Sequence, residues 1–246
     1  MPEQFSRGDL PHWYVPGHAH FVTYRLTNSL PSAALEELRI ERDRQLRSIR
    51  KLGSERAEAL RNMHKRLFAR YDEYLDTRLD DCWLKEAAVA NIMRENLYHH
   101  HQKKYELIAY CVMPNHMHVV FQPFESSITR SMESVADVFE VSGFGCESLD
   151  SRCVLGGMHS LKSYTANRAN ELLGRAGTFW QRESYDHWIR SIDELERIIA
   201  YVAANPVKAG LCKRPCDWQF SSAYDRYQLD RSECAYISWL QDNWRR

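Results

Sequence analysis

The sequence has no long uncharged apolar run, so we expect no membrane-spanning segment. Its beginning, MPEQFSRGDLPHWYVPGHAH, contains no apolar stretch of signal-peptide length. The cysteines number seven and have no repeating spacing, which argues against the disulfide framework of a secreted protein. Cys212 and Cys216 form a C-x3-C pair without a matching second pair, so a structural zinc site is disfavoured. These absences predict a soluble protein of a reducing cytoplasm, with no membrane as partner.

A net charge is also lacking, because 33 lysine and arginine residues balance 33 aspartate and glutamate residues. Nucleic-acid-binding proteins are often basic, so the overall charge argues mildly against that class. The segment 159–214 nevertheless holds nine basic residues against six acidic ones. This local excess permits a phosphate-binding surface without demonstrating one.

Apolar alternation and β-forming residues predict strands at 20–27, 105–113 and 116–121 and a short extended segment at 178–181. Pro114-Asn115 between the second and third strands predicts a hairpin. Helical periodicity predicts helices at 33–80 (broken at Gly53-Ser54), 84–101, 126–139, 161–173 and 192–204, where Asn205-Pro206 stops the last. The order predicts an α+β fold, an antiparallel sheet with helices packed on one face. We expect one domain over 1–246, with a helical insertion at 33–80 and a loop insertion at the glycine-rich segment 143–157.

His116-Met117-His118 lies on a predicted strand, where alternate residues project to the same face. Two adjacent imidazoles suit a divalent transition metal or, with further oxygen ligands, Mg²⁺ or Mn²⁺. The spacing alone is a weak signal, because His18-Ala19-His20 repeats it and the histidines at 99–101 form a third cluster. From spacing alone, metal binding remains an open hypothesis for each of the three histidine clusters.

Tyr201 and Asn205 stand four residues apart on a predicted helix and therefore share one face. If that face meets the histidine-bearing strand, Asn205 can complete a His-His-Asn metal site and Tyr201 comes within reach of a bound phosphate. A phenol is a weak nucleophile at neutral pH, and a metal on the scissile phosphate would polarise and orient that phosphate for attack. Without further support, a half-buried helical tyrosine is the commoner reading.

Further support comes from a resemblance to a known family. The matching stretches are 20–26 (HFVTYRL) with 29–31 (SLP), 112–118 (VMPNHMH), 179–190 (FWQRESYDHWIR), 201–210 (YVAANPVKAG) and, more weakly, 217–218 (DW) with 221–222 (SS). In this combination and order the chain resembles the single-tyrosine HUH transposases, and most closely the REP-associated tyrosine transposases of bacteria.

The resemblance implies a ferredoxin-like sheet with His116 and His118, the metal ligands, on a central strand. It implies that Tyr201 is the nucleophile, that Asn205 is the third ligand, and that Mg²⁺ or Mn²⁺ is the cofactor. Members of the family cleave and join single-stranded DNA near palindromic hairpins, leaving a 5′-phosphotyrosine and a free 3′-OH. Single-stranded or hairpin DNA is thus the expected partner. We expect the protein in the bacterial cytoplasm, and at the nucleoid when it is bound to DNA. Whether it is a monomer or a homodimer stays open.

Other residues are candidates for supporting roles. His187, Tyr185 and Arg182 are candidates for contacts behind the ligands or with DNA, and Tyr185 is the rival nucleophile, although it has no ligand partner four residues on. The candidate DNA contacts are Lys162, Arg168, Arg175, Arg190 and Lys208 for phosphate and Trp180 for base stacking. Two alternative functions remain open, a non-catalytic hairpin-DNA-binding protein and a metal-dependent phosphodiesterase that activates water.

Overall fold

The computed structural model describes residues 4–7, 11–14, 18–77, 82–124, 149–182 and 184–230. The helix expected at 126–139 lies outside these residues. None of the described helices is long and apolar enough to cross a membrane.

Four antiparallel strands form the central sheet: β3 (His20–Arg25), β4 (Tyr105–Val112), β5 (His116–Pro123) and β6 (Tyr185–Trp188). Their order across the sheet is β4-β5-β3-β6. Strands β4 and β5 form the predicted hairpin, and β5 pairs on its other side with β3, so the two histidines lie on an interior strand. Strands β1 (Gln4–Arg7) and β2 (Pro11–Tyr14) form a separate antiparallel pair.

The helices are α1 (Ser32–Ile49), α2 (Arg56–Thr77), α3 (Ala87–His100), α5 (Leu149–Leu172), α6 (Ile192–Lys208) and α7 (Ser222–Asp230), with 3-10 turns at Trp83–Lys85 and Pro215–Asp217. In chain order, β3, α3, β4, β5, α5 and β6 give the ferredoxin-like succession of strands and helices. The predicted α+β class with an antiparallel sheet is confirmed.

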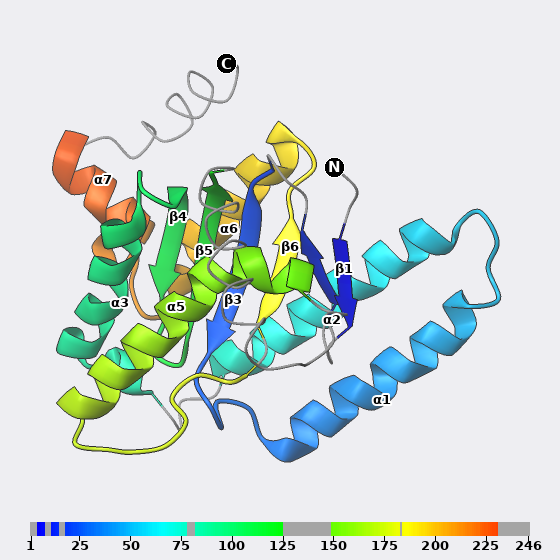
Figure 1. Cartoon of the computed structure of the whole chain (residues 1–246), viewed down its shortest axis with the longest axis horizontal. Helices are drawn as coiled ribbons and strands as arrows, with labels where there is room; N and C mark the ends of the chain where they lie inside the picture. Colours follow the sequence, from blue (N-terminus) through cyan, green and yellow to red (C-terminus); the bar gives the residue numbers. More distant parts are fainter. Residues whose placement is uncertain are drawn as a thin grey trace, which may run out of the picture.

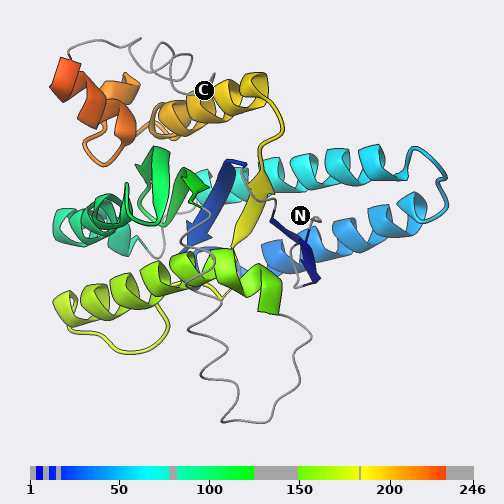
Figure 2. The same ribbon diagram turned by 45° about the horizontal axis from the view of Figure 1, so that its top comes forward.

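The helices occupy both faces of the sheet, where we expected one. Helices α3 and α5 cover the face that carries Tyr24, Met117 and Val119. The opposite face carries Phe21 and Val120 and packs against α6, with Phe68 of α2 at its margin. Figure 2 shows α6 and α5 on opposite sides of the strands. The reason is that both alternating sets of strand residues are buried: every residue of β3 is buried, which a sheet with one solvent-exposed face would not show.

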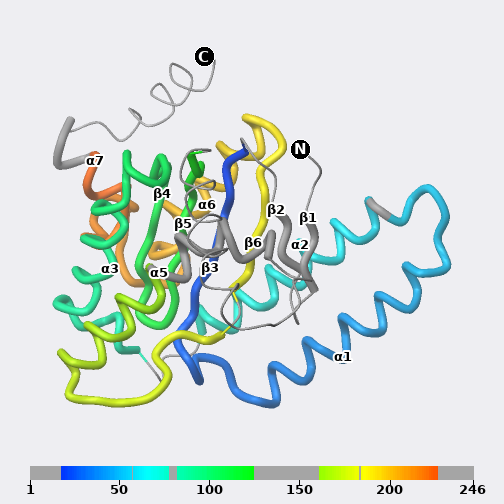
Figure 3. The backbone as a smooth tube through the Cα atoms, viewed as in Figure 1, coloured from blue at the N-terminus to red at the C-terminus, as the bar shows by residue number. Residues whose placement is uncertain are grey.

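Helices α1 and α2 form a hairpin between β3 and the 3-10 turn that precedes α3. The break falls at Gly53-Ser54, as predicted. The hairpin extends past the β6 edge of the sheet, while the last turns of α2 return beneath it (Figures 1 and 3). This segment therefore touches the sheet at one end and projects from it at the other.

Two helix boundaries differ most from the sequence prediction. Helix α5 begins at Leu149, so part of the expected loop 143–157 is helical and Gly156-Gly157 lies inside the helix. Glycine costs only about 1 kcal/mol relative to alanine in a helix interior, and the burial of Leu161 and Ala169 against the sheet offsets that cost. Helix α6 continues through Pro206 to Lys208, because a proline in the last turn removes a single backbone hydrogen bond.

Candidate metal and nucleophile site

His116 and His118 lie side by side on the face of β5 that α6 covers. Both side chains are fully buried, and their Nε2 atoms are 3.1 Å apart. Met117, between them, points into the opposite core. Phe21 of β3 stacks on the His118 ring at a centroid distance of 5.5 Å and closes one side of the pair.

A polar neighbour holds the Nδ1 atom of each imidazole. His116 Nδ1 donates to Asn115 Oδ1 at 2.7 Å, since an amide oxygen only accepts. His118 Nδ1 shares a hydrogen bond of 2.8 Å with Thr23 Oγ1 on β3. The Nε2 atoms are therefore the ones that face each other, as in histidines whose second nitrogen is fixed to orient a metal ligand. Burial and the neighbouring His118 lower the pKa of His116 and keep its imidazole neutral, the form that binds metals.

Asp72 of α2 is the third member of the cluster, and we did not predict it. Its Oδ1 lies 3.4 Å from His118 Nε2, and the side chain is almost fully buried. One ligand atom each from Asp72, His116 and His118 lies within 4.8 Å of the others. Burial opposes the charge on Asp72, but the interaction with His118 outweighs it and lowers the pKa of this carboxyl. Asn115 anchors α2 here by donating from Nδ2 to Leu75 O at 2.9 Å.

Tyr201 and Asn205 lie on one face of α6, as their four-residue spacing predicts. This face of α6 meets His118. Asn205 is fully buried, and its Nδ2 lies 3.1 Å from His118 Nε2. The Tyr201 ring lies 5.5 Å from the His118 ring. Burial and then the charge of Asp72 raise the pKa of Tyr201, so the phenol is neutral.

The buried oxygen atoms of this site fit a divalent cation. Within the described part of the chain, Asn205 Oδ1 and the Tyr201 hydroxyl have no hydrogen-bond partner, and Asp72 Oδ1 has only its 3.4 Å contact with His118 Nε2. Buried oxygens without partners are costly unless another ligand satisfies them. Two imidazoles, a carboxylate and an amide form a mixed nitrogen and oxygen donor set of the kind that divalent metals take. The cluster can therefore hold a divalent metal.

A lysine and a second carboxylate border the cluster. Lys208 Nζ lies 2.8 Å from Asp76 Oδ2 and 3.2 Å from Asp72 Oδ2. Asp72 and Asp76 are four residues apart on α2, so they share a face. The four-residue spacing of these two aspartates is the sequence pattern that could have indicated their place in the site. The two residues lie in a run of charged residues, however, which is typical of a solvent-exposed helix face.

Tyr185 and His187 lie on the site's face of β6 but have other partners. Tyr185 stacks on Phe68 at 4.0 Å, and Phe68 also packs against the rings of His118 and Tyr201. His187 Nε2 lies 3.1 Å from Glu194 Oε1 at the start of α6. Arg182 is exposed. Tyr185 thus reaches the imidazole pair through Phe68, whereas His187 is held by α6.

The predicted phosphate contacts are mostly engaged within the fold. Lys162 donates to the carbonyls of residues 181 and 182, and Lys208 pairs with Asp72 and Asp76. Of the others, Arg168 pairs with Glu171, Arg175 lies on Trp83, Arg190 lies on Trp188, and Trp180 is buried with its indole N–H on Thr165. Their predicted role in binding DNA stays a prediction.

Comparison with known proteins places this site in a context. No protein-family model matches the chain. A Haemophilus influenzae protein named "Putative REP-associated tyrosine transposase" is 25% identical over 118 residues, which cover 48% of this chain and 58% of that protein. A solved structure described as a REP-associated tyrosine transposase bound to a REP hairpin is 16% identical and covers 90% of this chain and 83% of that one, with a TM-score of 0.47. The relative confirms the resemblance to REP-associated tyrosine transposases that the motifs predict.

Proposed function

We propose that this protein cuts and rejoins single-stranded DNA at hairpin sequences through a covalent bond between Tyr201 and a 5′-phosphate. One observation carries the proposal: α6 brings Tyr201 and Asn205 onto His116, His118 and Asp72, which are far away in the sequence. The hairpin substrate is proposed from the similarity to REP-associated tyrosine transposases. Such a substrate would place the protein at the nucleoid of a bacterial cytoplasm.

We propose that His116, His118, Asp72 and Asn205 hold Mg²⁺ or Mn²⁺. When bound, such an ion would polarise the scissile phosphate and stabilise the charge that develops during attack. Thr23 and Asn115 keep the two imidazoles in the orientation that presents Nε2. Because carboxylate and amide oxygens join the imidazoles, the donor set favours Mn²⁺ or Mg²⁺ over the softer metals that thiolates select.

The chain's own residues account for the proton in the proposed step. Tyr201 Oη forms a bond to phosphorus, and the bond from phosphorus to the 3′-oxygen breaks. As the bond to phosphorus forms, the phenol proton passes to the neighbouring Asp72 carboxylate, the charged group that acts most strongly on this phenol. That proton then reaches the departing 3′-oxygen, giving a free 3′-OH. Reversal of the same transfers on a new 3′-OH would rejoin the strand.

The proposal is tested with labelled hairpin DNA carrying single-stranded flanks, taken from around the protein's own gene, in Mg²⁺ or Mn²⁺ on denaturing gels. We expect a protein-linked DNA band with the parent chain and none with Tyr201→Phe or His116→Ala. Tyr185→Phe is the matched control, since it removes the hydroxyl of another half-buried tyrosine on the same face of the sheet. This control should keep the adduct.

Two outcomes favour the alternative functions. Cleavage without an adduct that survives in Tyr201→Phe would indicate a phosphodiesterase that activates water. Hairpin binding with no cleavage across several hairpins would indicate a non-catalytic DNA-binding protein. An adduct lost in Tyr185→Phe but kept in Tyr201→Phe would identify Tyr185 of β6 as the nucleophile.

A further inference from the structure

A pocket lies between the α1–α2 hairpin and the sheet, next to the candidate site. Its volume is about 330 Å³, within the range of small-molecule sites. Leu35, Leu38, Leu67 and Phe68 make an apolar floor. Phe68 is shared with the candidate site, because its ring also packs against His118 and Tyr201. A ligand in this pocket would thus sit beside the proposed position of the scissile phosphate.

A buried guanidinium lines the pocket. Arg25 is only 5% exposed, and it pairs with His116 across β3 and β5, on the same face of the sheet. Its guanidinium lies 5.5 Å from the centre of the Tyr71 ring, and its Nε has no hydrogen-bond acceptor among the described residues. A buried donor without an acceptor is costly, so this nitrogen indicates a ligand that brings an acceptor oxygen or nitrogen into the pocket.

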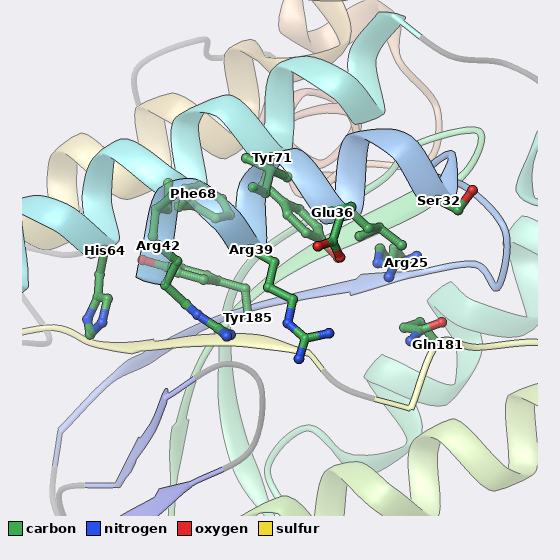
Figure 4. Close-up of a pocket in the computed structure, with 13 residues that line it drawn as sticks. Arg25, Ser32, Glu36, Arg39, Arg42, His64, Phe68, Tyr71, Gln181 and Tyr185 are labelled. Carbon is green, nitrogen blue, oxygen red and sulfur yellow. The ribbon is translucent and has the colours of Figure 1, made fainter. Parts of the chain in front are cut away.

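The rim of the pocket is positively charged. Arg39 and Arg42 extend from one face of α1 in the same direction, toward β6 (Figure 4), and Arg42 Nε also pairs with Asp43 Oδ1 at 3.0 Å. His64 of α2 lies farther along the rim, and Glu36 is the acidic residue among the lining side chains. Arginine is well suited to phosphate oxygens because its guanidinium presents several donors in one plane. The pocket thus combines an apolar and aromatic floor, a buried donor and a cationic rim.

We propose that this pocket binds one unpaired nucleotide of the DNA strand adjacent to the scissile phosphate. The base lies on the apolar floor and accepts a hydrogen bond from Arg25, while the backbone phosphate lies against Arg39 and Arg42. Single-strand binding proteins combine aromatic surfaces for bases with basic grooves for the backbone in this way. The inference rests on the proposed function for its substrate, and it assigns to the α1–α2 hairpin a part in positioning the strand.

The test measures binding in the Tyr201→Phe background, where the proposed covalent step is removed. The probe is a mixed-sequence single strand of about ten nucleotides with 2-aminopurine at one position, moved along the strand in a series. We expect the fluorescence to be quenched at one position only. The double variant Arg39→Ala/Arg42→Ala should weaken binding about tenfold and make the slope of log K against log salt shallower by about one.

Two further variants keep the test decisive. Arg47→Ala/Arg50→Ala is the matched control, because it removes the same charge from exposed positions at the C-terminal end of α1. It should leave affinity and quenching close to those of the parent. Leu35→Trp fills the pocket without changing charge and should abolish the quenching, with circular dichroism confirming that the helices are kept. Equal losses from the two double variants, or undiminished quenching in Leu35→Trp, would overturn the proposal.

A second assay tests the proposed function independently of the pocket. The same variants with Tyr201 restored are assayed for the DNA-linked band at saturating hairpin DNA. If the pocket proposal alone fails, adducts form while position-specific quenching is absent. If the proposed function alone fails, quenching and its loss in Arg39→Ala/Arg42→Ala persist while no variant forms an adduct.

Discussion

Both imidazoles of the site depend on a hydrogen bond at Nδ1, from residues that touch no substrate in the proposed step. Thr23 Oγ1 holds His118 at 2.8 Å, and Asn115 Oδ1 holds His116 at 2.7 Å. Partners of this kind fix which ring nitrogen faces the metal and raise its basicity. The affinity of the site for a metal thus depends on residues that orient the ligands without binding the metal themselves.

Replacing Thr23 with valine keeps the shape of the side chain and removes the hydroxyl. We expect Thr23→Val to bind Mn²⁺ about 10- to 100-fold more weakly, because His118 loses its orienting partner. Isothermal titration with Mn²⁺ measures this, and Thr23→Ser, which restores the hydroxyl, should recover most of the affinity. Unchanged affinity in Thr23→Val would mean that the hydrogen bond does not orient the ligand.

The sequence predicts those site residues whose spacing matches a regular element. His116 and His118 share a face because they are two apart on a strand, and Tyr201 and Asn205 because they are four apart on a helix. That the two faces meet, at Asn205 Nδ2 and His118 Nε2, follows only from the packing of α6. Asp72 could not be predicted in this way, because a tertiary contact of a charged helix brings it to the site.

At the scale of elements, the position of α6 is fixed at its first turn. The Ser191 hydroxyl accepts from the Glu194 backbone N–H, and Glu194 Oε2 accepts from the Arg190 backbone N–H at 3.0 Å. Glu194 Oε1 also binds His187 of β6. The hydrogen bond with His187 and then that with Arg190 outweigh burial and lower the pKa of Glu194 to about 2. This carboxylate joins α6 to the edge strand of the sheet.

Glu194→Gln should therefore lower the free energy of unfolding by about 2 kcal/mol at pH 7, as expected for lost charge-assisted hydrogen bonds. A carboxyl with a lowered folded-state pKa stabilises the fold above its ordinary pKa of 4.5 and loses this contribution as pH falls toward about 2. The difference from the parent should thus shrink across that window.

Urea unfolding at several pH values measures this difference. Glu196→Gln on the same helix is the control and should stay close to the parent. A gap between Glu194→Gln and the parent that is constant from pH 7 to pH 3 would contradict the account.

Element boundaries were predicted less well than the elements themselves. The pattern at 192–204 identifies α6, but Pro206 did not end it, since the Ala209 backbone N–H still donates to Asn205 O at 2.9 Å. Gly156 and Gly157 likewise do not break α5. Local preferences of about 1 kcal/mol for glycine and about 3 kcal/mol for proline are smaller than the gain from burying a helix face, and only the fold shows which faces are buried.

On the scale of the whole molecule, the candidate site joins three parts of the chain: the α1–α2 hairpin, the sheet and α6. A cation bound by Asp72, His116, His118 and Asn205 would link them, and it would bind the folded state alone. At a Mn²⁺ concentration of about 100 times Kd, the expected stabilisation is about 2.7 kcal/mol. For a chain of this size, that corresponds to a rise in Tm of roughly 5–10 °C.

Thermal unfolding with and without Mn²⁺ tests this linkage. Asp72→Asn should lose most of the rise in Tm at the same Mn²⁺ concentration. Glu73→Gln, which removes a neighbouring exposed charge from α2, should retain it. An equal rise in both variants would show that the hairpin contributes no ligand.

The central claim is that Tyr201 forms the covalent bond to DNA, and peptide mapping of the adduct tests it most directly. Trypsin releases Tyr201 in peptide 198–208 and Tyr185 in peptide 183–190, each with a single tyrosine. After reaction with hairpin DNA and nuclease trimming, mass spectrometry should find the nucleotide phosphate on peptide 198–208, at Tyr201. Modification of peptide 183–190 instead, or cleaved DNA with no modified tyrosine, would contradict the account.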